Sequence, residues 1–148
     1  MDTENADVVK PPLWYWIAGG LALIWNLLGV MAFFGSLKIT QAELVEAYGQ
    51  ERADLIAAQP EWYPIVFGLA VFGGAIGCLG LLLRKNWAGH ALILSLIAVI
   101  IQNIYFFVLS DVGKYVHGGE WVMTLMIPIV AVLLVLLARK AKAAAWTS

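Results

Sequence analysis

Charged residues are missing from four long segments of this 148-residue chain. Its nine basic and ten acidic residues lie in the N-terminal tail, the connections and the C-terminal end. An apolar helix of about 20 residues crosses about 30 Å of hydrocarbon, so the sequence predicts four transmembrane helices. The uncharged segments are Leu13–Leu37, Trp62–Leu83, Asn86–Ser110 and Trp121–Ala138.

The chain is also poor in residues that serve catalysis or metal binding. Cys78 is its only cysteine, which excludes an intramolecular disulfide and paired-thiol redox chemistry. The two histidines, His90 and His117, fall on opposite sides of the predicted bundle and cannot share a metal or haem. No carboxylate lies in a span, which disfavours proton-coupled transport. We therefore expect a non-enzymatic protein without cofactor, metal or nucleic-acid partner.

What the chain does contain is an excess of apolar residues. They make up 62% of the sequence, and the mean hydropathy is +0.85, both above the range of soluble domains. The connections are too short for a separate soluble domain. We predict an all-α fold with one transmembrane domain over residues 1–148. The expected spans are about 13–37, 62–83, 87–109 and 121–138.

The longest connection carries its own helix signal. Thr40 and Glu43 have the spacing of a capping box, in which each side chain bonds the other residue's backbone N–H. Apolar residues then recur at near-helical spacing, which predicts an amphipathic helix over about 41–58 that ends before Pro60 and is interrupted by Gly49. The helix is either a lid or docking surface over the bundle, or a solvated connector.

Basic residues are unevenly divided between the two sides of the predicted membrane. Six lie on the side of the termini and three on the other. Because cytoplasmic loops carry more Lys and Arg, we expect a bacterial inner-membrane protein with both termini in the cytoplasm. The six are Lys10, Arg84, Lys85, Arg139, Lys140 and Lys142, and the three are Lys38, Arg52 and Lys114.

Most tryptophans occur at the predicted ends of spans. Trp14, Trp62, Trp87 and Trp121 are placed to anchor the helices at the membrane interface. Trp25 is an exception, because it lies near the middle of the first span. Interface anchoring therefore does not explain Trp25.

Few polar side chains lie deep in the spans, and counting along the helices relates them. Asn26 and Gln102 each lie about 20 Å from the inner face at a rise of about 1.5 Å per residue. Pro128 removes a helical N–H and should leave the carbonyl of Thr124 free to accept a hydrogen bond. With Asn103, these residues predict one polar layer in the outer third of the bundle.

Three interpretations of this layer remain open. Its amides can join the helices by hydrogen bonds. They can instead form a neutral pocket for a small uncharged or zwitterionic ligand or a lipid headgroup, because amides both donate and accept. They can also contact a partner helix. Tyr105, one turn further out, would extend the layer.

The second span contains the pattern Gly73-x-x-x-Gly77. Small residues at this spacing let two helices approach closely in a membrane. The pattern predicts helix packing, either inside the chain or with a second copy or a partner protein.

Several segments resemble a family of small bacterial four-helix inner-membrane proteins of unknown function. The similar segments are Leu23–Met31, Ala70–Cys78, Arg84–Ala88 and the pair Arg139-Lys140. Such proteins are sometimes labelled sugar transporters without an established activity. The resemblance implies the four-helix topology and draws attention to Trp25 and Asn26, and it implies no catalytic residue.

Two functions follow from these observations. The first is an integral membrane protein, surrounded by the lipid bilayer, that assembles as a homo-oligomer or as a small subunit of a membrane complex. The alternative is a facilitator or binding protein for a small uncharged solute or lipid that uses the polar layer.

Overall fold

A computed structural model describes residues 9–148, and the acidic tail Asp2–Asp7 lies outside the described residues. The described chain consists of helices and connections without strands, which confirms the all-α prediction. Four of its helices are long and apolar enough to cross a membrane, so the protein is a multi-pass membrane protein. They are α1 (Leu13–Ser36), α4 (Trp62–Leu82), α5 (Ala88–Ile104) with its continuation η1 (Tyr105–Leu109), and α6 (Glu120–Ala143).

The third span is not a regular helix to its end. Its last turn, η1, is π-helical, and the N–H of Ser110 donates to the carbonyl of Tyr105 at 2.8 Å. A π-turn accommodates an extra residue and reorients the side chains beside it. It follows directly after Gln102 and Asn103.

The connection between α1 and α4 folds into two helices, α2 (Gln41–Tyr48) and α3 (Gln50–Ala57). The prediction of one helix over 41–58 is therefore corrected. Gly49 separates the two helices with a φ of 82°, a conformation that glycine adopts without steric cost. The predicted capping box is present: the Thr40 N–H donates to Glu43 at 2.7 Å, and the Glu43 N–H donates to the Thr40 hydroxyl.

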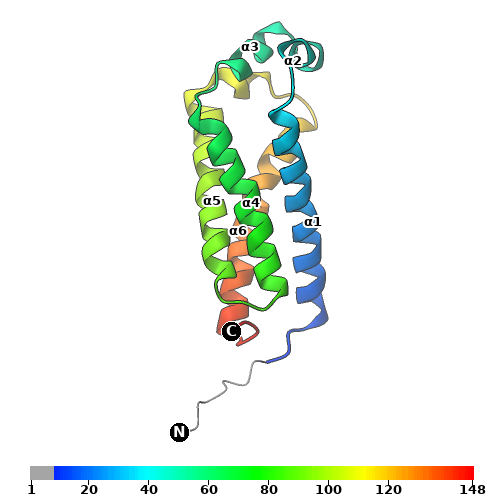
Figure 1. Ribbon diagram of the computed structural model, residues 1–148, viewed down its shortest axis with the longest axis vertical. Helices are drawn as coiled ribbons and strands as arrows, with labels where there is room; N and C mark the ends of the chain where they lie inside the picture. The colour runs from blue at the N-terminus through cyan, green and yellow to red at the C-terminus, as the bar shows by residue number, and fades with distance from the viewer. Residues whose placement is uncertain (1–8) are drawn as a thin grey trace.

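Among the four spans, α4 packs against both α1 and α5, and α6 packs along α5 (Figure 1). Glycines permit the closest of these contacts. A Cβ atom added at Gly77 would lie 2.5 Å from Cγ of Leu92, and one at Gly73 would lie 3.3 Å from Cβ of Ser95. Gly73 and Gly77 thus pack against α5 of the same chain.

Both described chain ends lie at the same end of the bundle, here called the terminal end (Figure 1). Arg84, in the turn between α4 and α5, joins them. Its Nε donates to the carbonyl of Trp146, and its Nη2 donates to the carbonyl of Val9, each at 2.8 Å. The opposite end, which carries α2 and α3, is the loop end.

The largest buried cluster fills the bundle near the terminal end. Tyr15 is 1% exposed, and its hydroxyl donates to the carbonyl of Leu81 at 2.6 Å. Trp146 packs edge-on against its ring. The other buried members come from three helices: Cys78, Ala88, Leu92, Leu134, Val135, Ala138 and Ala141. This end of the bundle is therefore closed by side chains.

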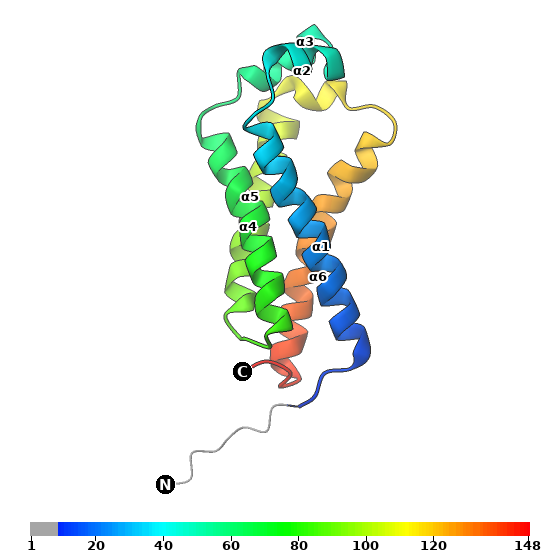
Figure 2. The same ribbon diagram turned by 45° about the vertical axis from the view of Figure 1, so that its right-hand side comes forward.

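Toward the loop end the bundle widens. Figure 2 shows the part of α6 nearest the loop end leaning away from α4 and α5. Pro128 lies inside α6, where it removes a helical hydrogen bond and favours a bend. Among the described helices, α1 and α6 do not form a closely packed pair. The bundle is thus tight at the terminal end and open in its loop-end half.

We expect the α4–α5 contact to tolerate no added methyl group. Gly77→Ala places a carbon against Leu92 and should lower the unfolding free energy by about 1–3 kcal/mol. Gly20→Ala is the control, because nothing lies within 4 Å of its added carbon and alanine favours helix by up to about 1 kcal/mol. Thermal unfolding in mild detergent, followed by tryptophan fluorescence, measures both. Equal midpoints for the two variants would contradict the prediction.

Candidate functional site

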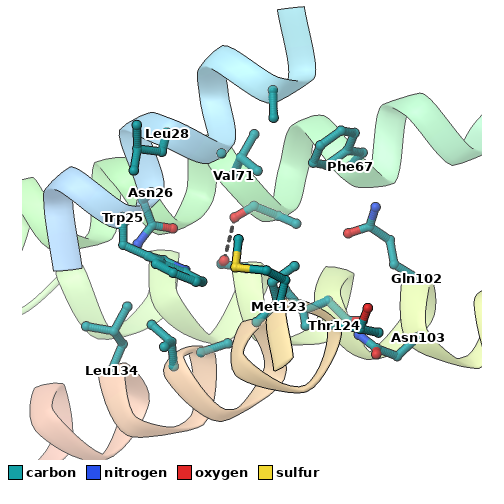
Figure 3. A pocket seen from close by; sticks show the side chains of 18 of the residues that line it. Trp25, Asn26, Leu28, Phe67, Val71, Gln102, Asn103, Met123, Thr124 and Leu134 are labelled. Carbon is teal, nitrogen blue, oxygen red and sulfur yellow. Dashed lines mark hydrogen bonds between the residues drawn. The ribbon is translucent and has the colours of Figure 1, made fainter. Parts of the chain in front are cut away.

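A cavity of about 390 Å³ lies between the four spans in the wider half of the bundle (Figure 3). All four spans contribute to its wall, as expected for a cavity along the bundle axis. Most of its lining is aliphatic or aromatic, and no charged side chain of the described residues lines it. Its polar lining residues are Asn26, Tyr63, Ser95, Gln102, Asn103 and Thr124, with the indole of Trp25.

Asn26 and Ser95 form the polar group nearer the terminal end. Nδ2 of Asn26 donates to the carbonyl of Ala22 at 2.8 Å and to Sγ of Cys78 at 3.6 Å. The Asn26 oxygen lies directly against Gly74 of α4, where a side chain would exclude it. The Ser95 hydroxyl is buried and donates to Ala70 at 2.5 Å. These polar groups join α1 and α5 to α4, as structural hydrogen bonds do.

The second group of polar side chains lies nearer the loop end, and fewer of its donors and acceptors have hydrogen-bond partners. Nδ2 of Asn103 donates to the carbonyl of Val99 at 2.8 Å, and the Thr124 hydroxyl donates to that of Glu120 at 2.9 Å. Neither side chain joins its helix to another in the described chain. The Gln102 carboxamide makes no hydrogen bond to its own helix there, and it approaches the Tyr63 hydroxyl of α4 as a hydrogen-bonding partner. This group therefore retains free donors and acceptors toward the cavity.

The structure thus corrects the prediction of one polar layer. Figure 3 shows Asn26 at one end of the cavity and Gln102, Asn103 and Thr124 at the other. Asn26 and Ser95 both approach Gly74, and Ser95 precedes Gln102 by seven residues, or about 10 Å along the helix. Counting residues failed because it treats the helices as upright and level, whereas α1 runs obliquely past α4 (Figure 2).

Two other parts of the predicted layer differ as well. Pro128 lies inside α6 but does not line the cavity. Tyr105 packs against Trp62 and Tyr63, at ring-centroid distances of 5.4 and 5.1 Å, and does not line the cavity. The π-turn explains this placement, because Tyr105 is its first residue.

Sequence reasoning missed some lining residues. Trp25 projects from α1 toward α6, beside Leu134 (Figure 3). Its position in the middle of a span, where interface anchoring does not apply, was the sequence feature that could have assigned it to the cavity. Met123 reaches into the cavity from the first turn of α6 (Figure 3), and no sequence pattern distinguished it. Tyr63 lies beside Trp62 at the start of the second span. This position in the sequence indicates an interface residue and not a cavity residue.

The loop end of the bundle is covered by α2 and α3, together with the short helix η2 (Asp111–Tyr115) (Figure 2). Arg52 of α3 joins this cover to the start of α6. Its Nη1 donates to both oxygens of Glu120, at 3.0 and 3.1 Å, and to the carbonyl of Tyr115 at 3.2 Å. Its guanidinium lies 4.4 Å from the centre of the Tyr48 ring, and its side chain is only 14% exposed.

Further hydrogen bonds fix the cover. The Tyr115 hydroxyl donates to Glu51 at 3.0 Å, and this carboxylate raises the pKa of Tyr115. The backbone and side-chain hydrogen bonds from Thr40 lower the pKa of the Glu43 carboxyl. Asp54 accepts from Gln41, which links α3 to α2. These contacts hold α2 and α3 in place over the loop end of the bundle. They favour the interpretation of this segment as a lid over its interpretation as a solvated connector.

No family model, curated protein or solved structure matches this chain. The resemblance to small bacterial four-helix proteins therefore stays a prediction, and the site is interpreted from its own residues.

The contact between Arg52 and Glu120 should hold the cover in place. Glu120→Gln leaves the largely buried Arg52 guanidinium without its charge partner and weakens the two hydrogen bonds between them. We expect amide hydrogen exchange in residues 41–57 to rise about tenfold, the equivalent of 1.4 kcal/mol, while exchange in α4 and α5 stays unchanged. Lys114→Gln is the control, because it removes the exposed Lys114–Asp111 pair, which contributes little. Unaltered exchange in the Glu120 variant would contradict the assignment.

Proposed function

We propose that this protein is a non-enzymatic integral membrane protein that binds a small uncharged molecule in the cavity between its four spans. The observation that carries the proposal is the incomplete pairing of the Gln102 and Asn103 carboxamides, which keep hydrogen-bonding capacity at the loop-end side of a mostly apolar cavity. Polar groups in a membrane bundle normally find protein partners. A ligand would satisfy those that remain.

Three properties of the cavity support this proposal. Its volume of about 390 Å³ falls within the usual range of small-molecule sites. Its mostly apolar wall with a few polar groups is typical of such sites. The lack of charged lining residues disfavours an ionic ligand, because a buried charge without a partner is costly.

Binding is better supported than passage across the membrane. The terminal end of the bundle is filled by Tyr15, Leu81 and their buried neighbours, so no path continues beyond the cavity on that side. We therefore prefer a binding protein to a facilitator.

Assembly with other chains has less support than ligand binding. Gly73 and Gly77, which favoured an oligomer or a partner complex, pack against α5 inside the chain. The exposed apolar face of α1, with residues such as Leu21 and Leu28, is also what contact with the lipid bilayer produces. Neither observation requires a partner protein.

A cavity-filling substitution tests the proposal directly. Ala131 lines the cavity from α6, whereas its neighbour Val132 does not and is 44% exposed. We expect Ala131→Phe to reduce saturable photolabelling of the cavity by a neutral diazirine-bearing octanol about tenfold, equivalent to 1.4 kcal/mol, because the ring occupies the ligand's space. Val132→Phe, which adds the same ring on the outer surface, should leave labelling unchanged. Equal labelling in both variants, measured by mass spectrometry, argues against the site.

We further propose that the protein resides in the bacterial inner membrane with its terminal end in the cytoplasm. The positive-inside tendency supports this, because Arg84, Lys85, Arg139 and Lys140 all lie near that end. A fluorescent protein fused after Ser148 should fluoresce, and alkaline phosphatase fused there should be inactive. The reverse pattern would exclude the topology without bearing on the cavity.

A further inference from the structure

The polar groups of the cavity are unequal at its two ends. Near the terminal end, Nδ2 of Asn26 donates to Cys78 and Ala22, and the Ser95 hydroxyl donates to Ala70. Near the loop end, the Gln102 carboxamide has the Tyr63 hydroxyl as a partner and keeps further hydrogen-bonding capacity, and the oxygen of Asn103 accepts no hydrogen bond from the described residues (Figure 3). A ligand therefore meets free donors and acceptors near the loop end, whereas near the terminal end only the Asn26 oxygen, which packs against Gly74, lacks a hydrogen bond among the described residues.

These free groups determine the chemistry of the polar part of the ligand. The Gln102 carboxamide donates and accepts, and the Asn103 and Thr124 oxygens accept. A hydroxyl or a carboxamide matches this set, because each can donate and accept at once. A carboxylate, phosphate or ammonium group does not, since no lining residue carries a compensating charge.

The remainder of the cavity fits a hydrocarbon chain. From Gln102 toward the terminal end its wall consists mainly of Val71, Leu92, Val99, Val130 and Leu134, and the Trp25 indole crosses it beside Leu134 (Figure 3). With a volume near the lower end of the usual range, it suits one chain and not two.

The surroundings of the cavity point to the bilayer as the source of the ligand. The cover α2–α3 is fastened over the loop end by Arg52, and the terminal end is packed. On the side between α1 and α6, however, the two helices lack a close contact. Trp25 from α1 and Met123 from α6 form the lining there (Figure 3), and an apolar molecule in the membrane can enter past them.

We infer that the ligand is a neutral single-chain amphiphile from the bilayer, with a hydroxyl or carboxamide head bound by Gln102, Asn103 and Thr124. Its hydrocarbon chain runs along the bundle toward Trp25 and Leu134. This inference rests on the proposed function and adds to it the ligand class, the orientation and the lateral route of entry.

Two isomeric photolabels test the orientation. The protein in phosphatidylcholine nanodiscs is exposed to decan-1-ol that carries a diazirine either beside the hydroxyl or at the far end of the chain. The head-side diazirine should label Tyr63 or Gln102, and the chain-end diazirine should label Trp25 or Leu134. Labelling is expressed relative to Leu133, which is 58% exposed and does not line the cavity.

Competition tests the head group. Unlabelled decan-1-ol and decanamide should block cavity labelling, whereas decanoate and decane should be at least about tenfold weaker, equivalent to 1.4 kcal/mol. Gln102→Leu should weaken the alcohol about tenfold while leaving labelling by a diazirine-bearing decane unchanged. Asn26→Leu, a matched change at the saturated end, should lower thermal stability and leave labelling per folded protein unchanged.

The outcomes separate the two proposals. If no photolabel gives saturable labelling of the cavity, both proposals fail. If labelling is saturable but the two diazirines mark the same residues, or decanoate competes as well as decanol, this inference is overturned and the proposed function stands. An unchanged Gln102→Leu variant likewise removes the assigned head-group site.

Discussion

The close approach of α4 to α5 is the constraint on which the rest of the structure depends. Where Gly73 and Gly77 face Ser95 and Leu92, the two backbones come too near for a side chain between them. In a bilayer, where apolar surface gains nothing by leaving lipid, such backbone contact is a principal source of helix association. The glycine-rich face of α4 therefore fixes one pair of helices, and the remaining spans are arranged around this pair.

The cavity results from how the two helices outside this pair, α1 and α6, are placed. Gly74 admits the Asn26 carboxamide and thereby seats α1 on α4, while α6 is held at the terminal end by the cluster around Leu134 and Ala138. The loop-end part of α6 leans outward (Figure 2). The bundle thus widens on that side, and the cavity lies between the four spans there, with Phe106 of the π-turn among its lining residues.

The sequence predicted the four spans and the capping box, because length, hydropathy and local hydrogen bonding are properties of short segments. It indicated the interruption at Gly49, which is a local property of glycine, but it could not predict the tilt of α1, since this depends on contacts between distant segments. Asn26 and Gln102 illustrate the difference. Both were found as rare polar residues in apolar spans, yet their relative depth required the structure. Trp25 and Met123 could likewise be assigned to the cavity only from the structure.

The contrast between the two amides also explains why composition alone left their role open. Asn26 and Gln102 are chemically alike, and each lies in an uncharged span. Asn26 meets Cys78 and Gly74 of a neighbouring helix, whereas Gln102 meets the Tyr63 hydroxyl of α4 and otherwise faces the cavity. An amide inside a membrane costs free energy unless it is paired. Because the loop-end part of α6 leans away, Gln102 keeps hydrogen-bonding capacity toward the cavity and serves as the proposed binding group, whereas Asn26 joins two helices.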